Sequence, residues 1–586
     1  MEGTGPIAAG RTVPRRRIRL TRGLVVALAA LALLLLVVHP LGWIIFNSLH
    51  DDDTGAWSVA NYTALITNRS LIAPMVNSLL LGFAVAILSV MFGVPIAWLV
   101  ARTDMPGRKL VGVLVLAAFV TPSFIGATAW ILLAAPNSGW LNVLARRLPG
   151  MGHALFDIYS MPGAIFVSAI YTVPYTFTIV ASVLEEIAVE LEDAATTLGA
   201  RTLRTMWSIS LPLAMPSVIA GFILSFVQGV TLFGVPAFLL VPAGIPVVTT
   251  RLAEFYQLFP PGLFASAAYC MPLLLVTAAM FSVRKRILGR RQFVTIGGKA
   301  RAKRLIKLHR WRWPAFAAAM IVPMLAVVMP YVVLLLVSLS RSWGRGVSLD
   351  NLTWHWYWWA LFSSGDTVRA MRNSLGYSAA AATACVILGT AVVYIVERRL
   401  VWGGRILGAL ASAPIIIPGV VLSVGYFAAY THAPLNLYGT PAIMVAAFTA
   451  TFLPIAYAHG GSILKGIGLE LEHAARSLGA GEGRTFLAIT APLMQSGLIA
   501  GWLLVFIPII RELSVVIFLI TPQTNVMTTL IYNAKDGGAY EALCAMSVLL
   551  LLTTLIVIVL VRLLSQRLVG RRLGGWSRTA LLEGVA

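Results

Sequence analysis

Charged side chains are scarce in this chain. Asp, Glu, Lys and Arg make up only 11% of its 586 residues, whereas 59% are hydrophobic. Apolar runs of about 20 residues recur along the chain, and a helix of that length crosses the roughly 30 Å hydrocarbon core of a bilayer. The composition therefore excludes an ordinary soluble globular protein and indicates an all-α integral membrane protein.

The chain also lacks the short motifs that carry much enzyme chemistry. It has no G-x-x-x-x-G-K-[ST] phosphate loop, no H-E-x-x-H and no G-x-S-x-G. Its three cysteines, Cys270, Cys385 and Cys544, lie far apart and match no metal or disulfide spacing. Its eight histidines are scattered, and a lone histidine in a helix bundle is more often hydrogen-bonded than a metal ligand. We therefore predict no catalytic residue, no metal site and no enzyme activity in this chain.

Basic residues outnumber acidic ones by 44 to 22, which gives a net charge of +22. A nucleic-acid partner is disfavoured because the basic residues lie in loops between apolar runs, where positive charge marks the cytoplasmic side. The densest basic segment separates two sets of six apolar runs. The predicted organisation, with both termini cytoplasmic, is a basic arm, a transmembrane half, a basic linker, a second transmembrane half and a tail, at residues 1–23, 24–284, 285–312, 313–564 and 565–586.

About twelve transmembrane helices are expected, six in each half. The third span of each half is predicted as one helix, over Leu110–Leu133 and over Ile406–Tyr430. The fifth span is predicted over Pro216–Leu239 and over Ser496–Ile520.

One polar stretch occurs twice between these spans. The stretch that begins at Val189 aligns without a gap with the one that begins at Leu469, at an offset of 280 residues. About half of the positions from Glu190 to Gly221 are identical in the second copy. Such an internal repeat predicts two homologous halves.

Each copy is predicted to form a helix, a turn and a second helix. Ile187, Leu191, Ala194, Ala195 and Leu198 fall on one face of a helix with 3.6 residues per turn, and the second copy repeats this pattern. Gly199 and Gly479 follow, where a helix can end in a left-handed residue. The second helix is expected to break at Pro212 and Pro492. An amphipathic connector on the membrane surface is the alternative, but it gives no reason for a shared register.

The two copies resemble the EAA loop of permease subunits in binding-protein-dependent ABC importers. The pattern is Glu-Ala-Ala, three residues, Gly, about nine residues and Ile-x-Leu-Pro. Here Glu192-Asp193-Ala194-Ala195 leads to Gly199 and Ile209-Ser210-Leu211-Pro212, within a loop over residues 185–214. The second copy, within 465–494, runs from Glu472-His473-Ala474-Ala475 to Gly479 and Ile489-Thr490-Ala491-Pro492. Both depart from the pattern, since one residue separates Glu from Ala-Ala and Ala491 replaces Leu.

The resemblance implies the fold of a type I ABC importer permease in a bacterial cytoplasmic membrane. It implies two ATP-binding subunits on the cytoplasmic face, which bind ATP and Mg for a chain without a cofactor of its own, and an external substrate-binding protein. Glu192 and Glu472 would pair with basic residues of the ATPase or be solvated. The residues expected to couple to the ATPase are Glu190, Glu192, Ala194, Ala195, Gly199, Glu470, Glu472, Ala474, Ala475 and Gly479.

Arg511 and Glu512 are adjacent charges within an apolar segment. Charges inside a membrane usually face a cavity and mark a functional site, so we expect both to line a translocation path. Gln228, in the fifth span of the first half, is a lesser candidate. The alternative is that Arg511 and Glu512 anchor the helix near the external interface.

A single chain with two such halves resembles the ferric-iron permeases of this superfamily, as do the stretches Phe233–Leu239 and Arg511–Ser514. Ferric iron is therefore the expected substrate. Fused permeases for thiamine and 2-aminoethylphosphonate share the architecture and remain alternatives. An ion-coupled secondary transporter also has repeats and twelve spans, but it needs no polar cytoplasmic stretch of this kind.

Overall fold

The computed structural model describes residues 15–51, 54–149, 153–187, 189–200, 202–257, 262–289, 305–346 and 348–582. Most of the predicted arm (1–14), half of the linker (290–304) and the end of the tail (583–586) lie outside these ranges. Within them the chain forms helices and three isolated β-bridges. The fold is therefore all-α, as the composition predicts.

The helices of the first half run in the order expected from the apolar runs. Their bounds are α1 (Arg15–Leu33), α2 (His39–Ser48), α3 (Ala60–Thr67), α4 (Arg69–Arg102), α5 (Arg108–Val120), α6 (Ser123–Ala134), α7 (Trp140–Ala145), α8 (Met161–Glu186), α9 (Val189–Thr197), α10 (Thr202–Thr205), α11 (Leu211–Thr231), α12 (Gly234–Leu239), α13 (Val248–Gln257) and α14 (Leu263–Gly289).

The second half repeats most of this order. Its helices are α15 (Arg312–Pro323), α16 (Met329–Ser338), α17 (His355–Trp358), α18 (Gly365–Glu397), α19 (Gly404–Ser412), α20 (Gly419–Tyr430), α21 (Pro441–Lys465), α22 (Leu469–Ser477), α23 (Glu482–Thr485), α24 (Ala491–Ile510), α25 (Met527–Asp536) and α26 (Tyr540–Leu582).

The third span of each half is broken rather than straight. Ten helices in the described ranges are long and apolar enough to cross a membrane, or up to 12 if each bent pair is one span. The bent pairs turn by 102° after Val120 and by 114° after Ile416, so the prediction of one helix in each place is wrong. Pro122 and Pro418 follow the breaks, and a residue before proline avoids the helical region. Thr121 and Ile417 are accordingly extended, with ψ of 120° and 119°.

The fifth spans are shorter than predicted. α11 ends at Thr231 instead of Leu239, and α24 ends at Ile510 instead of Ile520. Leu232 is extended and Thr249 donates its hydroxyl hydrogen to the Leu232 carbonyl oxygen. Thr528 does the same to the Glu512 carbonyl oxygen. In the first half the sequence stays apolar past Thr231, and in the second half apolar residues resume after Arg511 and Glu512, so hydropathy alone could not locate these tertiary contacts.

The predicted break at Pro212 and Pro492 is also absent. Residues 206–210 and 486–490 form π turns that lead directly into α11 and α24. A π turn widens the helix and shifts its hydrogen bonds, so a proline in the following turn is accommodated without ending the helix. The coupling stretch is therefore continuous with the fifth span.

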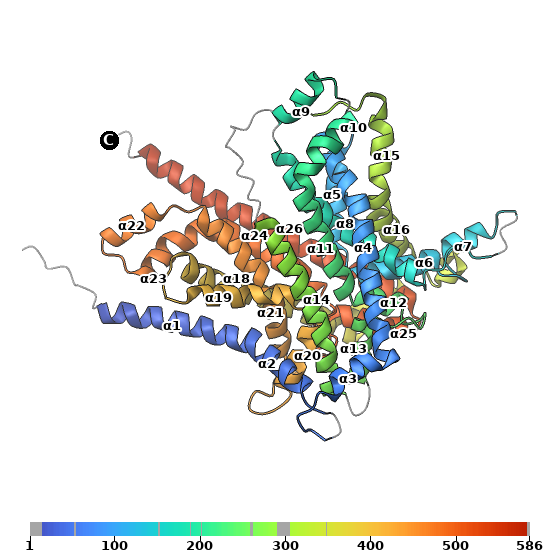
Figure 1. The fold of residues 1–586 in the computed structure, drawn as a ribbon, viewed down its shortest axis with the longest axis horizontal. Coiled ribbons are helices and arrows are strands. Elements are labelled where there is room, and N and C mark those ends of the chain that lie inside the picture. The colour runs from blue at the N-terminus through green and yellow to red at the C-terminus, as the bar shows by residue number, and fades with distance from the viewer. Residues whose placement is uncertain are drawn as a thin grey trace, which may run out of the picture.

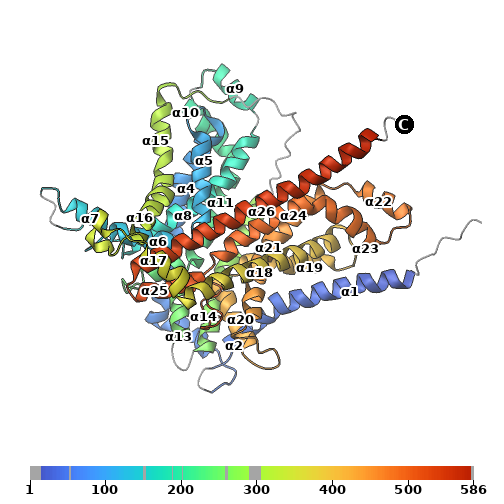
Figure 2. The same ribbon diagram turned by 180° about the vertical axis from the view of Figure 1, so that it is seen from behind.

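The first span of each half packs partly on the other half. Helix α2 of the first half packs on α20, and the Tyr426 hydroxyl donates to the Leu36 carbonyl oxygen at 2.9 Å. Helices α15 and α16 of the second half pack on α5 and α6, and the hydroxyls of Thr121 and Tyr331 lie 2.8 Å apart. Figures 1 and 2 show α1 beside α19 and α15 beside α5. Each half is thus completed by a helix of the other.

Two arms diverge from a common base (Figures 1 and 2). One arm contains α4, α5, α8 and α11 and carries α9 and α10 at its end, whereas the other contains α18, α21 and α24 and carries α22 and α23. The base contains α12, α13, α20 and α25. The two copies of the repeated stretch therefore lie at the ends of different arms.

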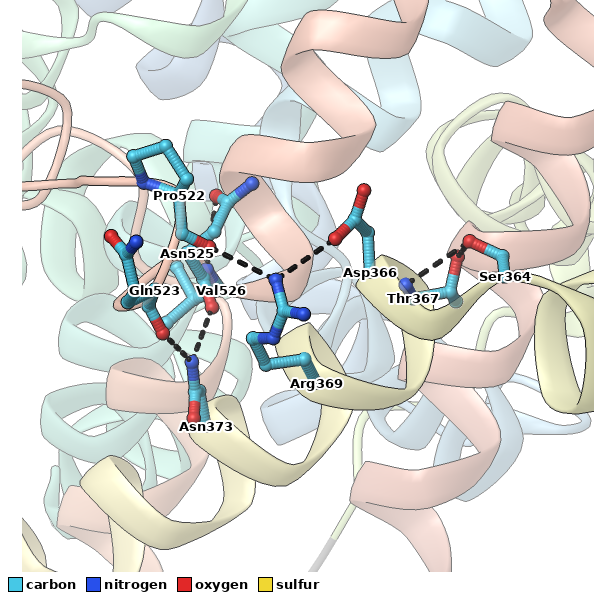
Figure 3. A network of polar contacts seen from close by, with 9 residues as sticks. All are labelled: Ser364, Asp366, Thr367, Arg369, Asn373, Pro522, Gln523, Asn525 and Val526. Atoms are coloured by element: carbon cyan, nitrogen blue, oxygen red, sulfur yellow. Dashed lines mark hydrogen bonds and ion pairs between the residues drawn. The ribbon is translucent and has the colours of Figure 1, made fainter.

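The second span of each half holds a helix of the base. Ser78 of α4 accepts a hydrogen bond from the first backbone N–H of α13, and Ser374 of α18 does so for α25, both at 2.8 Å. Each serine thus caps a helix distant in the sequence, the role that N-cap residues have locally. Figure 3 shows the neighbouring contacts: Asn373 donates to the carbonyl oxygens of Gln523 and Asn525, and Arg369 lies against Pro522.

Candidate functional site

The repeated stretches form short helices that end as expected at left-handed glycines. Gly199 and Gly479 have φ of 82° and 85°, and both helices are followed by a tight turn. A side chain with a Cβ is strained at such φ values, which accounts for glycine at both positions. The helix–turn–helix prediction is therefore confirmed, except that Ile187, expected on the same helical face, lies before α9 with an extended backbone because α8 ends there.

The outer surface of these helices carries leucines that the described residues leave uncovered. Leu198 and Leu478 are each 89% exposed, and Leu191 and Leu471 are about half exposed at 48% and 51%. Glu190, Ala194, Glu470 and Ala474 are exposed beside them, as are both glycines, while Ala195 and Ala475 are more covered. Exposed leucines in matching positions on two polar loops indicate a surface for a protein partner.

Glu192 and Glu472 lie on the opposite side of these helices and are buried, with 4% and 1% exposure. The Glu192 carboxylate forms a bidentate ion pair with Arg102 and accepts a hydrogen bond from Ser210 at 2.7 Å. Glu472 pairs with Arg398 at 2.9 Å and accepts a hydrogen bond from Thr490 at 3.1 Å. Both glutamates thus bind inside the chain, in contrast to the expectation of pairing with a partner or solvation.

A cavity of about 310 Å³ lies where the two halves meet. It is lined by the breaks in both third spans, by α8 and α21, and by the ends of α11 and α24. Gln228, Arg511 and Glu512, the three predicted path residues, all line it. The structure therefore brings together residues that are far apart in the sequence.

The walls of this cavity differ in chemistry between the halves. Helix α8 contributes Ser168, Tyr171, Thr172 and Tyr175, whereas α21 contributes mainly apolar groups such as Phe452 and Ile455. The cavity is thus lined by hydroxyls on one side and by hydrocarbon and the Arg511-Glu512 pair on the other.

Arg511 and Glu512 are adjacent but bind different groups. Arg511 donates through Nη1 to the carbonyl oxygen of Thr121 at 3.4 Å, at the end of α5. A positive charge is stabilising at this place, because the C-terminal end of a helix carries partial negative charge. Glu512 accepts through Oε1 the backbone N–H groups of Ser514 and Val515. Both charged groups therefore bind backbone at the bends that shape the cavity. They also line the cavity itself.

The base closes the molecule on the side away from the coupling helices. Lys535 of α25 donates to the Ala237 carbonyl oxygen of the first half at 2.9 Å and lies over the ring of Phe238. Tyr256 of α13 packs reciprocally on Phe427 and Phe518 of the second half. Each base helix thus seals against the opposite half.

Arg102 and Arg398 were not identified from the sequence. An offset of 296 residues relates them, and the same offset relates Asn77-Ser78 to Asn373-Ser374 in the same spans. Applying that offset to the end of the second span would have singled out both arginines. No pattern in the chain announces their glutamate partners, 90 and 74 residues away.

The broken helices, the paired coupling stretches and a cavity between two homologous halves define the permease class of membrane transport proteins. The family model for the inner membrane component of binding-protein-dependent transport systems matches residues 90–291 and 389–574, more than half of the chain. The protein belongs to this family. It is a multi-pass membrane protein and a permease of the ABC importer type.

Curated relatives carry several substrate names. The chain is 24% identical over 550 residues, 90% of its length and 77% of the relative's, to the ferric transport system permease protein FbpB of Actinobacillus pleuropneumoniae. It is 24% identical to a putative ferric transport system permease protein of Haemophilus influenzae, with 84% and 76% coverage. The sulfate transport system permease protein CysT of Salmonella typhimurium is 32% identical, but over 31% of this chain and 64% of the relative.

Proposed function

We propose that this chain forms the whole membrane pathway of an ABC importer for ferric iron in the bacterial cytoplasmic membrane. Two separate ATP-binding subunits dock on α9 and α22, and an external binding protein delivers the substrate to the base. The exposed, matching leucines at the ends of two arms carry this proposal, because they supply two equivalent partner surfaces on one chain.

The arrangement supports a mechanism of alternating access. The arms diverge at the coupling helices while Lys535 and Tyr256 seal the base. When ATP closes the two ATPase subunits, each would carry one coupling helix inward. The arms would approach and the base would open, which is a rigid-body switch between two states. The cavity that Gln228, Arg511 and Glu512 line would then face first outward and then inward.

The placement of the chain in the membrane follows from charge. The described part of the linker, which includes Lys307 and Arg310, is bound to the end of α4, where the Leu308 backbone N–H donates to the Asp104 carboxylate at 2.8 Å. Positive residues mark the cytoplasmic face. We therefore propose that both termini and both coupling helices lie on the cytoplasmic side.

Ferric iron is favoured over other solutes because the relatives named for ferric transport match a larger share of this chain. The relatives named for ferric transport match across both halves, whereas the sulfate relative matches about a third of the chain. Thiamine and 2-aminoethylphosphonate remain the alternatives within the same machinery. Membership of a binding-protein-dependent family argues against ion-coupled secondary transport.

The test is reconstitution of the chain in proteoliposomes with the ATPase and binding protein encoded beside it. Uptake of radiolabelled ferric iron, thiamine, 2-aminoethylphosphonate and sulfate is measured with ATP and without ATP on the side of the membrane that the ATPase subunits face. We expect iron uptake that requires ATP and the binding protein. Uptake of another solute would overturn the substrate, and uptake driven by an ion gradient without ATPase would overturn the mechanism.

A further inference from the structure

We propose that Arg102 and Arg398 are positioning residues for coupling: each ties its coupling helix to the cytoplasmic ends of three membrane spans, so that one movement is transmitted to all three. This inference rests on the proposed ATP-driven transport. It assigns the buried glutamates to force transmission within the chain instead of to contact with the ATPase.

The first ion cluster consists of Arg102, Glu192 and Ser210. Arg102 is the last residue of α4 and pairs with Glu192 of α9. Ser210 stands at the start of α11 and donates to the same carboxylate at 2.7 Å. All three are buried, with exposures of 5%, 4% and 0%. The carboxylate of the coupling helix is therefore bound to the second and fifth spans at once.

Arg102 also binds the end of the fourth span. Its Nη1 donates to the carbonyl oxygens of Leu184 and Ile187 at 3.3 and 3.2 Å, where α8 ends. Carbonyls at a helix C-terminus lack partners within the helix and are satisfied by such donors. One guanidinium group thus joins α4, α8 and α9, and the serine adds α11.

The second ion cluster consists of Arg398, Glu472, Thr490 and Arg476, and it repeats this plan. Arg398 follows α18, pairs with Glu472 at 2.9 Å and lies 3.5 Å from the carbonyl oxygen of Ile467, which follows α21. Thr490 donates to Glu472 at the start of α24. The same four-element junction occurs at both coupling helices, although the sequence between the arginine and the glutamate differs in length.

Burial makes these junctions stiff. An ion pair removed from water interacts strongly, and loss of one partner leaves an uncompensated buried charge. A helix held only by an exposed apolar surface could tilt when the ATPase moves it, whereas a helix held through three spans must move with them. Coupling by a contiguous network of packed and paired groups is the physical route for such transmission.

The two clusters differ in one respect that yields a sharper expectation. Glu192 is held by Arg102 through both oxygens, and no second cation contacts it among the described residues. Glu472 has a second cation, Arg476, whose Nη2 lies 3.7 Å from Oε2. Loss of Arg398 therefore leaves a partly compensated carboxylate, and loss of Arg102 does not.

The experiment uses the reconstituted transporter with three readouts: ATPase subunits bound per permease, ATP hydrolysis and ferric-iron uptake. For Arg102→Met we expect subunit binding and hydrolysis to stay near wild type while uptake per ATP falls about tenfold, the size of a typical coupling free energy. For Arg398→Met the fall is smaller, roughly threefold, and it reaches the larger value in Arg398→Met/Arg476→Met.

A covalent replacement separates transmission from folding. In Arg102→Cys/Glu192→Cys, a reversible bifunctional thiol reagent would restore the link, and the three native cysteines are buried and free. We expect uptake per ATP to recover after cross-linking and to fall again after reduction. Uptake per ATP that stays at the wild-type value in Arg102→Met, or a cross-linked variant that does not recover, overturns the proposal. A wild-type transporter without ATP-dependent uptake would instead refute the proposed function.

Discussion

At the scale of residues, burial decides what each charged group does. Glu190 and Glu192 are two positions apart on the same helix, yet one is exposed and the other is enclosed by Arg102 and Ser210. The buried glutamate is bound within the chain, whereas the exposed glutamate lies at the surface of the coupling helix. Arg511 and Glu512 are likewise neighbours that bind different backbone groups around the central cavity. Sequence adjacency therefore says little about which charges act together.

The cavity charges provide a test of the translocation path. Arg511→Met and Glu512→Gln should each lower ferric-iron uptake by about tenfold or more, equivalent to at least ~1.4 kcal/mol, because each removes a charge from the cavity wall. ATP hydrolysis should change less than uptake. The control is Arg405→Met, at an exposed arginine of α19 outside the cavity. Normal uptake by both cavity variants would mean that the substrate passes elsewhere.

At the scale of elements, close helix crossings depend on small residues, as is common in membrane helix pairs. A Cβ added at Gly389 of α18 would lie 3.1 Å from the backbone nitrogen of Tyr457 in α21. Gly93 holds the equivalent place in α4, where a Cβ would lie 3.0 Å from the Thr176 Cβ in α8. The two pairs of second and fourth spans therefore pack through glycine in the same way.

Helix α18 contains its own control for this packing. Gly389→Leu should destabilise the protein by about 1–3 kcal/mol, because overpacking forces α18 away from α21. Gly376 lies in the same helix with nothing within 4 Å of its added Cβ, so Gly376→Leu should have almost no effect. The stability of both variants is measured by thermal unfolding in detergent. Unfolding is monitored by the reaction of the three buried cysteines with a thiol-reactive dye. Equal losses of stability would contradict the packing argument.

At the scale of the whole molecule, the first spans join the two halves, because each packs partly on the other half. Helix α1 runs with the arm of the second half, and α15 runs with the arm of the first half. Each arm is thus a composite of both halves, and a change in the angle between the arms must involve the whole chain. This architecture suits a machine that changes between two rigid states.

Spin labels at the arm ends report that change. Lys109→Cys and Trp402→Cys place labels at exposed positions of opposite arms, outside α9 and α22 themselves. The distance between the labels should shorten by several ångströms when ATP is bound and hydrolysis is blocked, because the arms approach. Labels at Lys109→Cys and Trp313→Cys lie on α5 and α15 of one arm and should keep their distance. An unchanged distance between the arms would exclude the proposed closure.

Much of this protein follows from the sequence because hydropathy and repetition are local properties. Apolar runs locate the spans, and the aligned copies locate α9 and α22 with the glycines that end them. The surroundings of Arg511 indicate a cavity charge, since an apolar segment rarely tolerates one otherwise.

Other features depend on contacts between distant segments, which only the tertiary structure determines. Three of these features involve residues separated by tens to hundreds of positions. They are the pairing of Arg102 with Glu192, the packing of α1 and α15 on the opposite halves, and the contacts at the early ends of α11 and α24. The breaks at Pro122 and Pro418 were misjudged for a related reason. Hydropathy averages over a segment and is insensitive to one residue that redirects the backbone, whereas the packed structure requires that bend to form the cavity.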